Sequence, residues 1–300
     1  MSDTSSAYPF LDHELIGRLG NLQFLPRGLV EGTYSGMHRS PHHGASVEFA
    51  EYRKYVPGDD TKNIDWRVFA KTDRYYLKQY IADTNMRICF LVDCSHSMAF
   101  ESEFGTKLDY AKKLMATLAF VGINQGDSVG LYCFNNELTV EIPAKQSPRH
   151  LRMIYDRLNG LEPTAKTEIS DTLHSLAERI PRRAFIIVIS DFFTEVSKLL
   201  EAFEHMLYRK HDLALFHLLD KQEVNFDFDY PIKFNDMESK QSLTTEPGNI
   251  KQDYIAALDI YLKQMSDGCA EHKVDYQRII TDTPLEDALS SFLLERIHRH

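Results

Sequence analysis

The middle of the chain alternates between short apolar runs and segments whose apolar residues recur at helical spacing. The apolar runs are 86–92, 128–134, 184–189 and 213–219, and the helical segments are 107–125, 149–158, 169–180 and 194–209. Continuous apolar strands separated by amphipathic helices predict a mostly parallel sheet covered on both faces. The run 138–142 follows a turn at Asn135 and Asn136, which predicts one antiparallel edge strand. The pattern therefore predicts an α/β fold with a doubly wound sheet.

The two ends of the chain differ from this alternating middle. Residues 1–83 are expected to form an N-terminal arm, residues 84–222 the α/β domain, and residues 223–300 a C-terminal extension that packs on the same core. Within the extension, the pattern predicts helices at 254–265 and 284–297, a strand at 274–280, and irregular loops or short strands at 224–248.

Composition narrows the class of protein. The chain has 300 residues, 43% of them apolar, and a net charge of -10, which argues against a general nucleic-acid binder. Residues 1–20 lack a signal-peptide pattern, and no segment approaches the roughly 20 apolar residues that span a bilayer. The four cysteines form no Cys-x-x-Cys pair and two lie in apolar runs, which indicates free thiols. These features predict a cytoplasmic protein, although a domain anchored through a membrane partner would have the same composition.

Hard oxygen ligands gather where two predicted strands end. Asp93 follows the run 86–92, with Ser95 and Ser97 alternating behind it, and Asp191 follows the run 184–189. Ligands bind outside the carboxyl ends of strands in such folds, and carboxylate and hydroxyl oxygens suit Mg²⁺ or Mn²⁺ better than zinc. The alternative is that these residues only cap helices and form turns.

The run Asp93-Cys94-Ser95-His96-Ser97-Met98 resembles the metal-ion-dependent adhesion site of von Willebrand factor A domains. The resemblance implies a fold of that type, and it adds Thr167, ahead of the helix 169–180, and Asp191 as the family's threonine and final aspartate. It thus implies five metal residues: Asp93, Ser95, Ser97, Thr167 and Asp191. The family often has Gly just before this threonine, whereas Lys166 stands here and would weaken the metal unless it points to solvent.

A second resemblance lies between Gly36 and Tyr80. This segment contains Pro57-Gly58-Asp59-Asp60, Ile64-Asp65-Trp66 and Ala70-Lys71-Thr72-Asp73, and it is similar to the signature of the bacterial domain of unknown function 58 family. In that family the signature precedes a von Willebrand factor A-like domain. Its members often accompany MoxR-type AAA ATPases, so the resemblance implies a partner in a chaperone-like or assembly system and no reaction.

The signature also contains polar clusters and the single tryptophan. Trp66 is expected to be a buried anchor between the arm and the main sheet. Acidic and basic residues of the arm are expected to form an ion-pair network, with a catalytic carboxylate cluster as the alternative; they are Glu48, Arg53, Asp59, Asp60 and Asp65. The histidines His38, His42 and His43 are either exposed loop residues or metal ligands.

No phosphate-binding Gly-x-x-x-x-Gly-Lys loop and no Gly-x-Ser-x-Gly elbow occur in the sequence. No catalytic residue is predicted, and the chain is expected not to be an enzyme. The first hypothesis is a binding module in which a partner's Asp or Glu completes the metal's coordination. The alternatives are a metal-dependent hydrolase of phosphate esters and a structural scaffold with a vestigial metal site.

Overall fold

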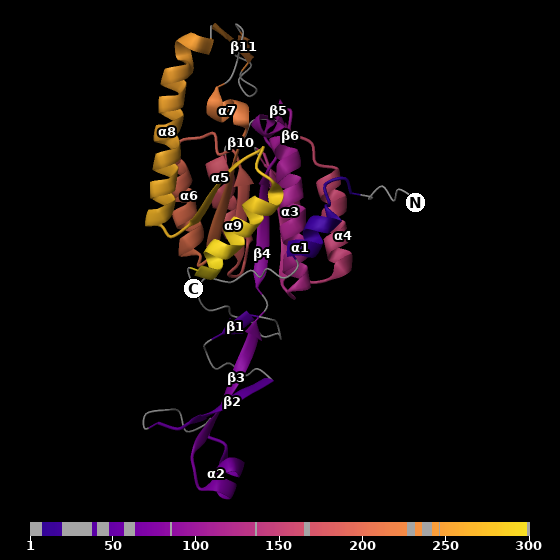
Figure 1. The fold of residues 1–300 in the computed structure, drawn as a ribbon, viewed down its shortest axis with the longest axis vertical. Helices are drawn as coiled ribbons and strands as arrows, with labels where there is room; N and C mark the ends of the chain where they lie inside the picture. Colours follow the sequence, from indigo (N-terminus) through magenta and orange to yellow (C-terminus); the bar gives the residue numbers. More distant parts are fainter. Residues whose placement is uncertain are drawn as a thin grey trace. The chain divides into compact units, whose positions relative to one another are not determined.

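The computed structural model describes residues 8–19, 38–40, 48–56, 64–84, 86–135, 137–164, 169–226, 232–235, 242–245 and 247–298. The chain folds into two compact units (Figure 1). The first contains residues 1–24 and 87–300, and the second contains residues 25–86.

The first unit is built on a six-stranded sheet with the strand order β13-β10-β9-β4-β7-β8. Its strands are β4 (Arg87–Asp93), β7 (Ser128–Phe134), β8 (Leu138–Lys145), β9 (Phe185–Ser190), β10 (Asp212–Leu219) and β13 (Asp275–Ile280). All neighbours are parallel except β8, which pairs antiparallel with β7 at one edge. The predicted fold class, a doubly wound and mostly parallel sheet with one antiparallel edge strand, is confirmed.

Helices cover both faces of this sheet (Figure 1). One face carries α1 (His13–Leu19), α3 (Lys107–Asn124), α4 (Pro148–Asn159) and α9 (Leu285–His298), and the other carries α5 (Ile169–Arg179), α6 (Val196–Tyr208) and α8 (Pro247–Glu271). Successive side chains of a strand point to opposite faces of the sheet, so each strand packs against both layers of helices. In β10, Leu215 joins the core beneath α5 and α6, whereas Phe216 meets Phe292 of α9 with ring centroids 4.8 Å apart.

Short elements complete the first unit: a 3₁₀ turn η2 (His96–Ala99), β5 (Glu101–Ser102), β6 (Gly105–Thr106), α7 (Lys221–Asn225), β11 (Ile232–Asn235) and β12 (Ser242–Thr245).

The position of α1 differs from the sequence boundaries, which assigned all of residues 1–83 to the arm. Leu15 and Ile16 of α1 are buried, because their apolar face packs with α3 and α9 of the first unit.

The chain order of the strands creates one switch point. From β4 the chain adds β7 and β8 on one side, and it then returns to add β9, β10 and β13 on the other. In doubly wound sheets the helices separate at this point, and a crevice opens outside the carboxyl ends of the two central strands. Here those strands are β4 and β9, which deliver Asp93 and Asp191 to the same edge of the sheet.

A buried ion cluster closes the opposite, amino end of the sheet. Arg296 of α9 donates to Asp212 and to Asp275, each at 2.6 Å, and these carboxylates stand at the starts of β10 and β13. The guanidinium also lies over the ring of Phe185, 3.9 Å from its centroid. A planar guanidinium that bonds two carboxylates and stacks on a ring is held in one orientation. The cluster therefore fixes α9 against three strands.

The second unit contains a three-stranded antiparallel sheet and one short helix. The sheet has the order β1-β3-β2, with β1 (His38–Ser40), β2 (Glu48–Lys54) and β3 (Tyr76–Thr84). The helix α2 (Trp66–Thr72) begins at Asp65, whose buried carboxylate accepts the backbone N–H groups of Arg67 and Val68. It ends at Asp73, which adopts a left-handed conformation with φ 55°.

Trp66 corrects the sequence interpretation. Its side chain is 60% exposed, so the prediction of a buried anchor is wrong. The cap at Asp65 places Trp66 in the first turn of a short helix, where its ring meets only the edges of Phe69 and Tyr75 of the same unit among the described aromatic pairs. A unit of this size lacks the interior needed to bury every large apolar side chain.

Candidate metal centre

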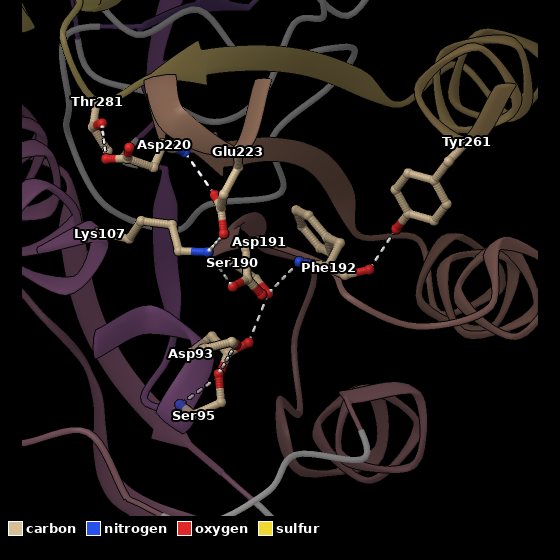
Figure 2. Close-up of polar contacts among 11 residues, drawn as sticks. Asp93, Ser95, Lys107, Ser190, Asp191, Phe192, Asp220, Glu223, Tyr261 and Thr281 are labelled. Carbon is tan, nitrogen blue, oxygen red and sulfur yellow. Dashed lines mark hydrogen bonds and ion pairs between the residues drawn. The ribbon is translucent and has the colours of Figure 1, made fainter. Parts of the chain in front are cut away.

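Asp93 is the last residue of β4 and lies at the centre of a buried hydrogen-bond network (Figure 2). One carboxylate oxygen accepts the backbone N–H of Ser95 at 2.8 Å, and the other accepts the hydroxyl of Ser190 at 2.7 Å. Ser190 is the last residue of β9, so this contact joins the carboxyl ends of the two central strands. The carboxylate is thereby held in a fixed orientation at the switch point.

The two serines of the loop after β4 face each other. Their hydroxyl oxygens, Ser95 Oγ and Ser97 Oγ, lie 2.9 Å apart, with Ser95 buried and Ser97 half-buried. The loop is pinned on both sides, since Cys94 donates its N–H to Phe134 and accepts the N–H of Thr164 at its carbonyl, each at 2.8 Å. Backbone pinning of this kind presents both hydroxyls from a rigid support, which a metal site requires.

Asp191 follows Ser190 and forms a buried ion pair. Its carboxylate accepts from the ammonium of Lys107 at 2.7 Å, and the same ammonium donates to Glu223 at 2.8 Å (Figure 2). The side chain of Lys107 is completely buried, at 0% exposure. Lys107 is the first residue of α3, and Glu223 belongs to α7 after β10. One lysine therefore links three elements at this edge of the sheet.

The link continues through α7. The second oxygen of Glu223 accepts the backbone N–H of Asp220 at 2.7 Å and completes a capping box at the start of this helix. Asp220 in turn accepts the hydroxyls of Ser102 and Thr281, each at 2.7 Å. Because every contact in this series is a hydrogen bond between buried or half-buried groups, the ends of β10 and β13 are tied to the site through Lys107.

The electrostatics leave an excess of negative charge beside Asp93. Burial is the larger cause and the charge of Asp191 the second, and together they raise the pKa of Asp93 to about 7. Burial by itself would lower the pKa of Lys107, but Asp191 and Glu223 outweigh it, so the net pKa of Lys107 is raised and the ammonium keeps its proton. The lysine is thus shared by Asp191 and Glu223, and Asp93 accepts the backbone N–H of Ser95 and the hydroxyl of Ser190.

Behind Asp191 the chain makes a strained turn. Phe192 has a left-handed φ of 50°, which is uncommon for a bulky residue. Its N–H donates to Ser190 Oγ at 2.9 Å, and its carbonyl accepts the hydroxyl of Tyr261 from α8 (Figure 2). These two bonds hold the turn that directs Asp191 into the site, and they connect α8 to it.

The structure brings four of the predicted metal residues to the ends of β4 and β9: Asp93, Ser95, Ser97 and Asp191. Thr167 and Lys166 lie outside the described residues, as do His42 and His43 and the side chains of much of the predicted ion-pair network of the arm. No group of three or more His, Cys, Asp or Glu side chains is arranged to hold a metal in the part of the chain that is described. The donors at the switch point are instead two carboxylates and two hydroxyls, which fit a hard cation such as Mg²⁺ in type.

Sequence reasoning missed Lys107 and Glu223. The available signal was the place of Lys107 on its helix, three, four and seven residues before the buried Tyr110, Ala111 and Leu114. A lysine on the apolar stripe of a helix requires a buried counter-charge. Glu223 offered the weaker signal of the sequence Asp220-Lys221-Gln222-Glu223, a capping box directly after an apolar strand.

Three solved structures are similar to this chain in fold. The conserved hypothetical protein BatB from Bacteroides thetaiotaomicron is 18% identical and matches 71% of this chain and 100% of its own, with a TM-score of 0.48. An aerotolerance-related membrane protein from Bacteroides fragilis is 15% identical over 72% of this chain and 100% of its own, also with a TM-score of 0.48. The SpRpn10 VWA domain is 12% identical over 69% of this chain and 95% of its own, with a TM-score of 0.41.

These comparisons correct one prediction. The expectation of a cytoplasmic protein is wrong in their light, because a similar structure is described as that of a membrane protein. Free thiols and a lack of long apolar runs are properties of a folded domain, and a domain held at a membrane has them as well. Within the described ranges, no helix combines the length and the apolar character needed to cross a bilayer.

Curated proteins are similar to this chain in sequence. The uncharacterized protein Rv1480 of Mycobacterium tuberculosis is 25% identical over 232 residues, which are 76% of this chain and 72% of the relative. The uncharacterized protein Mb1516 of Mycobacterium bovis matches to the same extent. The family model described as "Protein of unknown function DUF58" matches residues 51–259, more than half of the chain. The predicted family is therefore confirmed, and the chain belongs to the DUF58 family of proteins of unknown function.

Proposed function

We propose that this chain is a protein-interaction module that binds the Asp or Glu side chain of a partner through Mg²⁺ or Mn²⁺. The residues proposed to hold the ion are Asp93, Ser95, Ser97, Thr167 and Asp191. The observation that carries the proposal is the buried pair of carboxylates at the switch point, next to two facing hydroxyls. When bound, the ion supplies an open coordination position for a carboxylate oxygen.

The charge balance supports this proposal. Asp93 and Asp191 are 3% and 2% exposed, and their mutual repulsion contributes to the raised pKa of Asp93. A buried carboxylate pair of this kind is costly unless a cation compensates it. Lys107 is shared between Asp191 and Glu223, so a divalent ion bound by Asp93 and Asp191 would add positive charge that reduces the repulsion between these two carboxylates.

Lys107 also sets a condition on metal binding. An ion at Asp191 must share that carboxylate with the ammonium 2.7 Å away or displace it. Glu223 gives the displaced ammonium a second partner, since the two are already paired at 2.8 Å. Lys107 therefore lowers the affinity of the site for metal without leaving an unpaired buried charge when metal binds.

A MoxR-type AAA ATPase, or its client, is the proposed partner. Support comes from the association of the DUF58 signature with such ATPases and from the absence of a phosphate-binding loop in this sequence. A module that recognises a carboxylate and has no phosphate-binding loop of this type in its sequence is suited to act beside an ATPase that does the mechanical work. No catalytic residue is proposed.

A scaffold with a vestigial metal site is the second candidate, and one observation favours it. The ammonium of Lys107 already supplies a positive charge at Asp191, where the metal is proposed to bind. In that case the partner would dock without metal. The two candidates differ in one measurable property, the dependence of binding on a divalent ion.

The first experiment measures thermal stability with Mg²⁺ and with chelator for the wild type and for Asp93→Ala. The proposal expects Mg²⁺ to raise the melting temperature of the wild type and to leave that of Asp93→Ala unchanged. Asp275→Ala is the matched control, because it also removes a buried carboxylate but lies at the opposite end of the sheet. It should melt lower and keep its response to Mg²⁺. A wild type that responds to no divalent ion would exclude the metal site.

The second experiment measures capture of a purified MoxR-type ATPase by the immobilised chain, with Mg²⁺ and with chelator. Capture that requires Mg²⁺ and is lost in Asp93→Ala supports the proposal, and capture that persists with chelator favours the scaffold. Turnover of a generic phosphate ester that is lost in Asp191→Ala would instead favour the hydrolase alternative.

A further inference from the structure

The second unit exposes large apolar side chains at the end where β2 stops and β3 starts. Trp66 is 60% exposed, Val56 54% and Tyr75 47%. Three of the large apolar residues exposed in the described part of the chain thus fall within about twenty residues of one small unit. Clustered exposure of this kind marks an interaction surface, whereas scattered exposure does not.

Ring contacts show that these side chains form one surface. Phe69 stacks on Tyr75 with centroids 4.4 Å apart, and the Trp66 ring meets both of them edge-on, at 6.1 and 6.5 Å. Tyr55 lies 6.0 Å from Tyr75 and bonds to it through the backbone, which brings Val56 alongside. We call the five residues Tyr55, Val56, Trp66, Phe69 and Tyr75 the aromatic tip.

Basic residues lie next to the aromatic tip in the sequence. Four are exposed and precede, interleave with or follow its residues: Lys54, Arg67, Lys71 and Arg74. Asp73 is the exposed acidic residue among them. The chain as a whole carries a net charge of -10, so this basic cluster is opposite in sign to the average of the molecule. An anionic surface would attract this end of the second unit and repel the rest.

We propose that the aromatic tip docks onto the surface of an anionic lipid bilayer. Trp and Tyr rings are favoured at the headgroup level because one end of each ring is apolar and the other polar. Lysine and arginine beside them reach the phosphates while their stems cover apolar surface. The aromatic residues and the two arginines would suit a protein interface as well, so the choice rests on Lys54 and Lys71, since lysine is depleted from protein interfaces and attracted to anionic headgroups.

The proposed docking goes beyond the metal-dependent function and is independent of it. It uses none of the residues of the candidate metal centre, and it places the chain at a membrane surface without inserting a helix. It involves a short helix and two strand ends at which Val56, Trp66 and Tyr75 are already exposed, so it requires no rearrangement of the fold.

Trp66 is the single tryptophan of the chain and reports on the tip directly. The experiment adds vesicles of phosphatidylcholine, or of phosphatidylcholine with phosphatidylglycerol, to the full-length protein in chelator and follows tryptophan emission. Anionic vesicles should shift the emission to shorter wavelength and reduce its quenching by acrylamide, and added salt should reverse the effect. Unchanged emission with anionic vesicles would overturn the proposal, as would a shift produced by polyglutamate alone.

Co-sedimentation with the same vesicles tests the surface by substitution. Trp66→Ala and the double variant Arg67→Glu with Lys71→Glu should each reduce binding to anionic vesicles about tenfold. Tyr208→Ala is the matched aromatic control, because Tyr208 is 85% exposed on α6 of the first unit. Arg182→Glu with Lys198→Glu is the matched charge control, since both are exposed in the first unit. Equal losses in the controls would show that overall charge or non-specific adsorption, and not the aromatic tip, governs binding to the vesicles.

Discussion

Each end of the six-stranded sheet buries one cation between two carboxylates, but the surroundings of the two clusters differ. At the amino end, Arg296 lies between Asp212 and Asp275. At the carboxyl end, Lys107 lies between Asp191 and Glu223. Each cation comes from a helix and each pair of carboxylates comes from different elements, so both clusters tie a helix to the sheet.

The clusters differ in what surrounds them. The guanidinium of Arg296 stacks on Phe185 and bonds both carboxylates through separate nitrogens, so each carboxylate of this cluster contacts the cation directly. At the carboxyl end a further carboxylate, Asp93, lies close enough to Asp191 for its pKa to rise. The two clusters each hold one cation and two carboxylates, so the carboxyl end is distinguished as a candidate site by the additional carboxylate of Asp93 at the switch point.

The largest effect is expected at the closed end. Arg296→Met should lower the free energy of unfolding by about 4 kcal/mol, because it leaves two buried carboxylates without their cation. Urea denaturation with Mg²⁺ and with chelator should give the same loss. A loss that Mg²⁺ repairs would show that this cluster also accepts a metal, and the contrast between the two ends would fail.

A smaller and conditional effect is expected at the open end. Lys107→Met should lower the free energy of unfolding by about 3 kcal/mol in chelator, since Asp191 and Glu223 lose their shared cation. Mg²⁺ at a hundred times its dissociation constant should restore about 2.7 kcal/mol by binding only the folded state. The variant should also bind Mg²⁺ more tightly than the wild type in calorimetry. An unchanged or weaker affinity would contradict the inferred competition between the lysine and the metal.

The smallest effect concerns acid stability at the closed end. Burial, and then the charge of Arg209, lower the pKa of His211 to about 4, below the 6.5 expected when unfolded. The unfolded chain therefore binds the proton first, and this group's contribution to stability is lost as the pH falls from 6.5 towards 4. His211→Asn removes the titrating group and keeps an acceptor for the N–H of Ala184, which His211 binds at 3.2 Å.

In denaturation at pH 4.5 and at pH 7.5, the asparagine variant should lose about 2 kcal/mol less than the wild type between the two values. Equal losses would mean that His211 does not titrate in this range and that the closed end is insensitive to acid.

The pattern of apolar residues predicted most of the first unit. The strands at 128–134 and 213–219 are found as β7 and as β10, which begins one residue earlier, and the hairpin partner at 138–142 is found as the antiparallel β8. Since parallel strands all have their carboxyl ends at the same edge of the sheet, the placement of Asp93 and Asp191 at one edge followed from the predicted strands alone. The helix predicted at 254–265 extends over Pro247–Glu271 in the structure. The prediction was too short because the polar ends of this helix show no apolar residues at helical spacing.

The sequence by itself determined the alternation of strands and helices, the edge at which Asp93 and Asp191 stand, and the family. Only the tertiary structure decided which charges meet and which apolar side chains stay exposed. Lys107 is polar and Trp66 is apolar, yet Lys107 is buried and Trp66 exposed, because burial depends on neighbours brought from distant parts of the chain. Lys107 finds Asp191 and Glu223 across 84 and 116 residues, whereas Trp66 belongs to a unit too small to cover it.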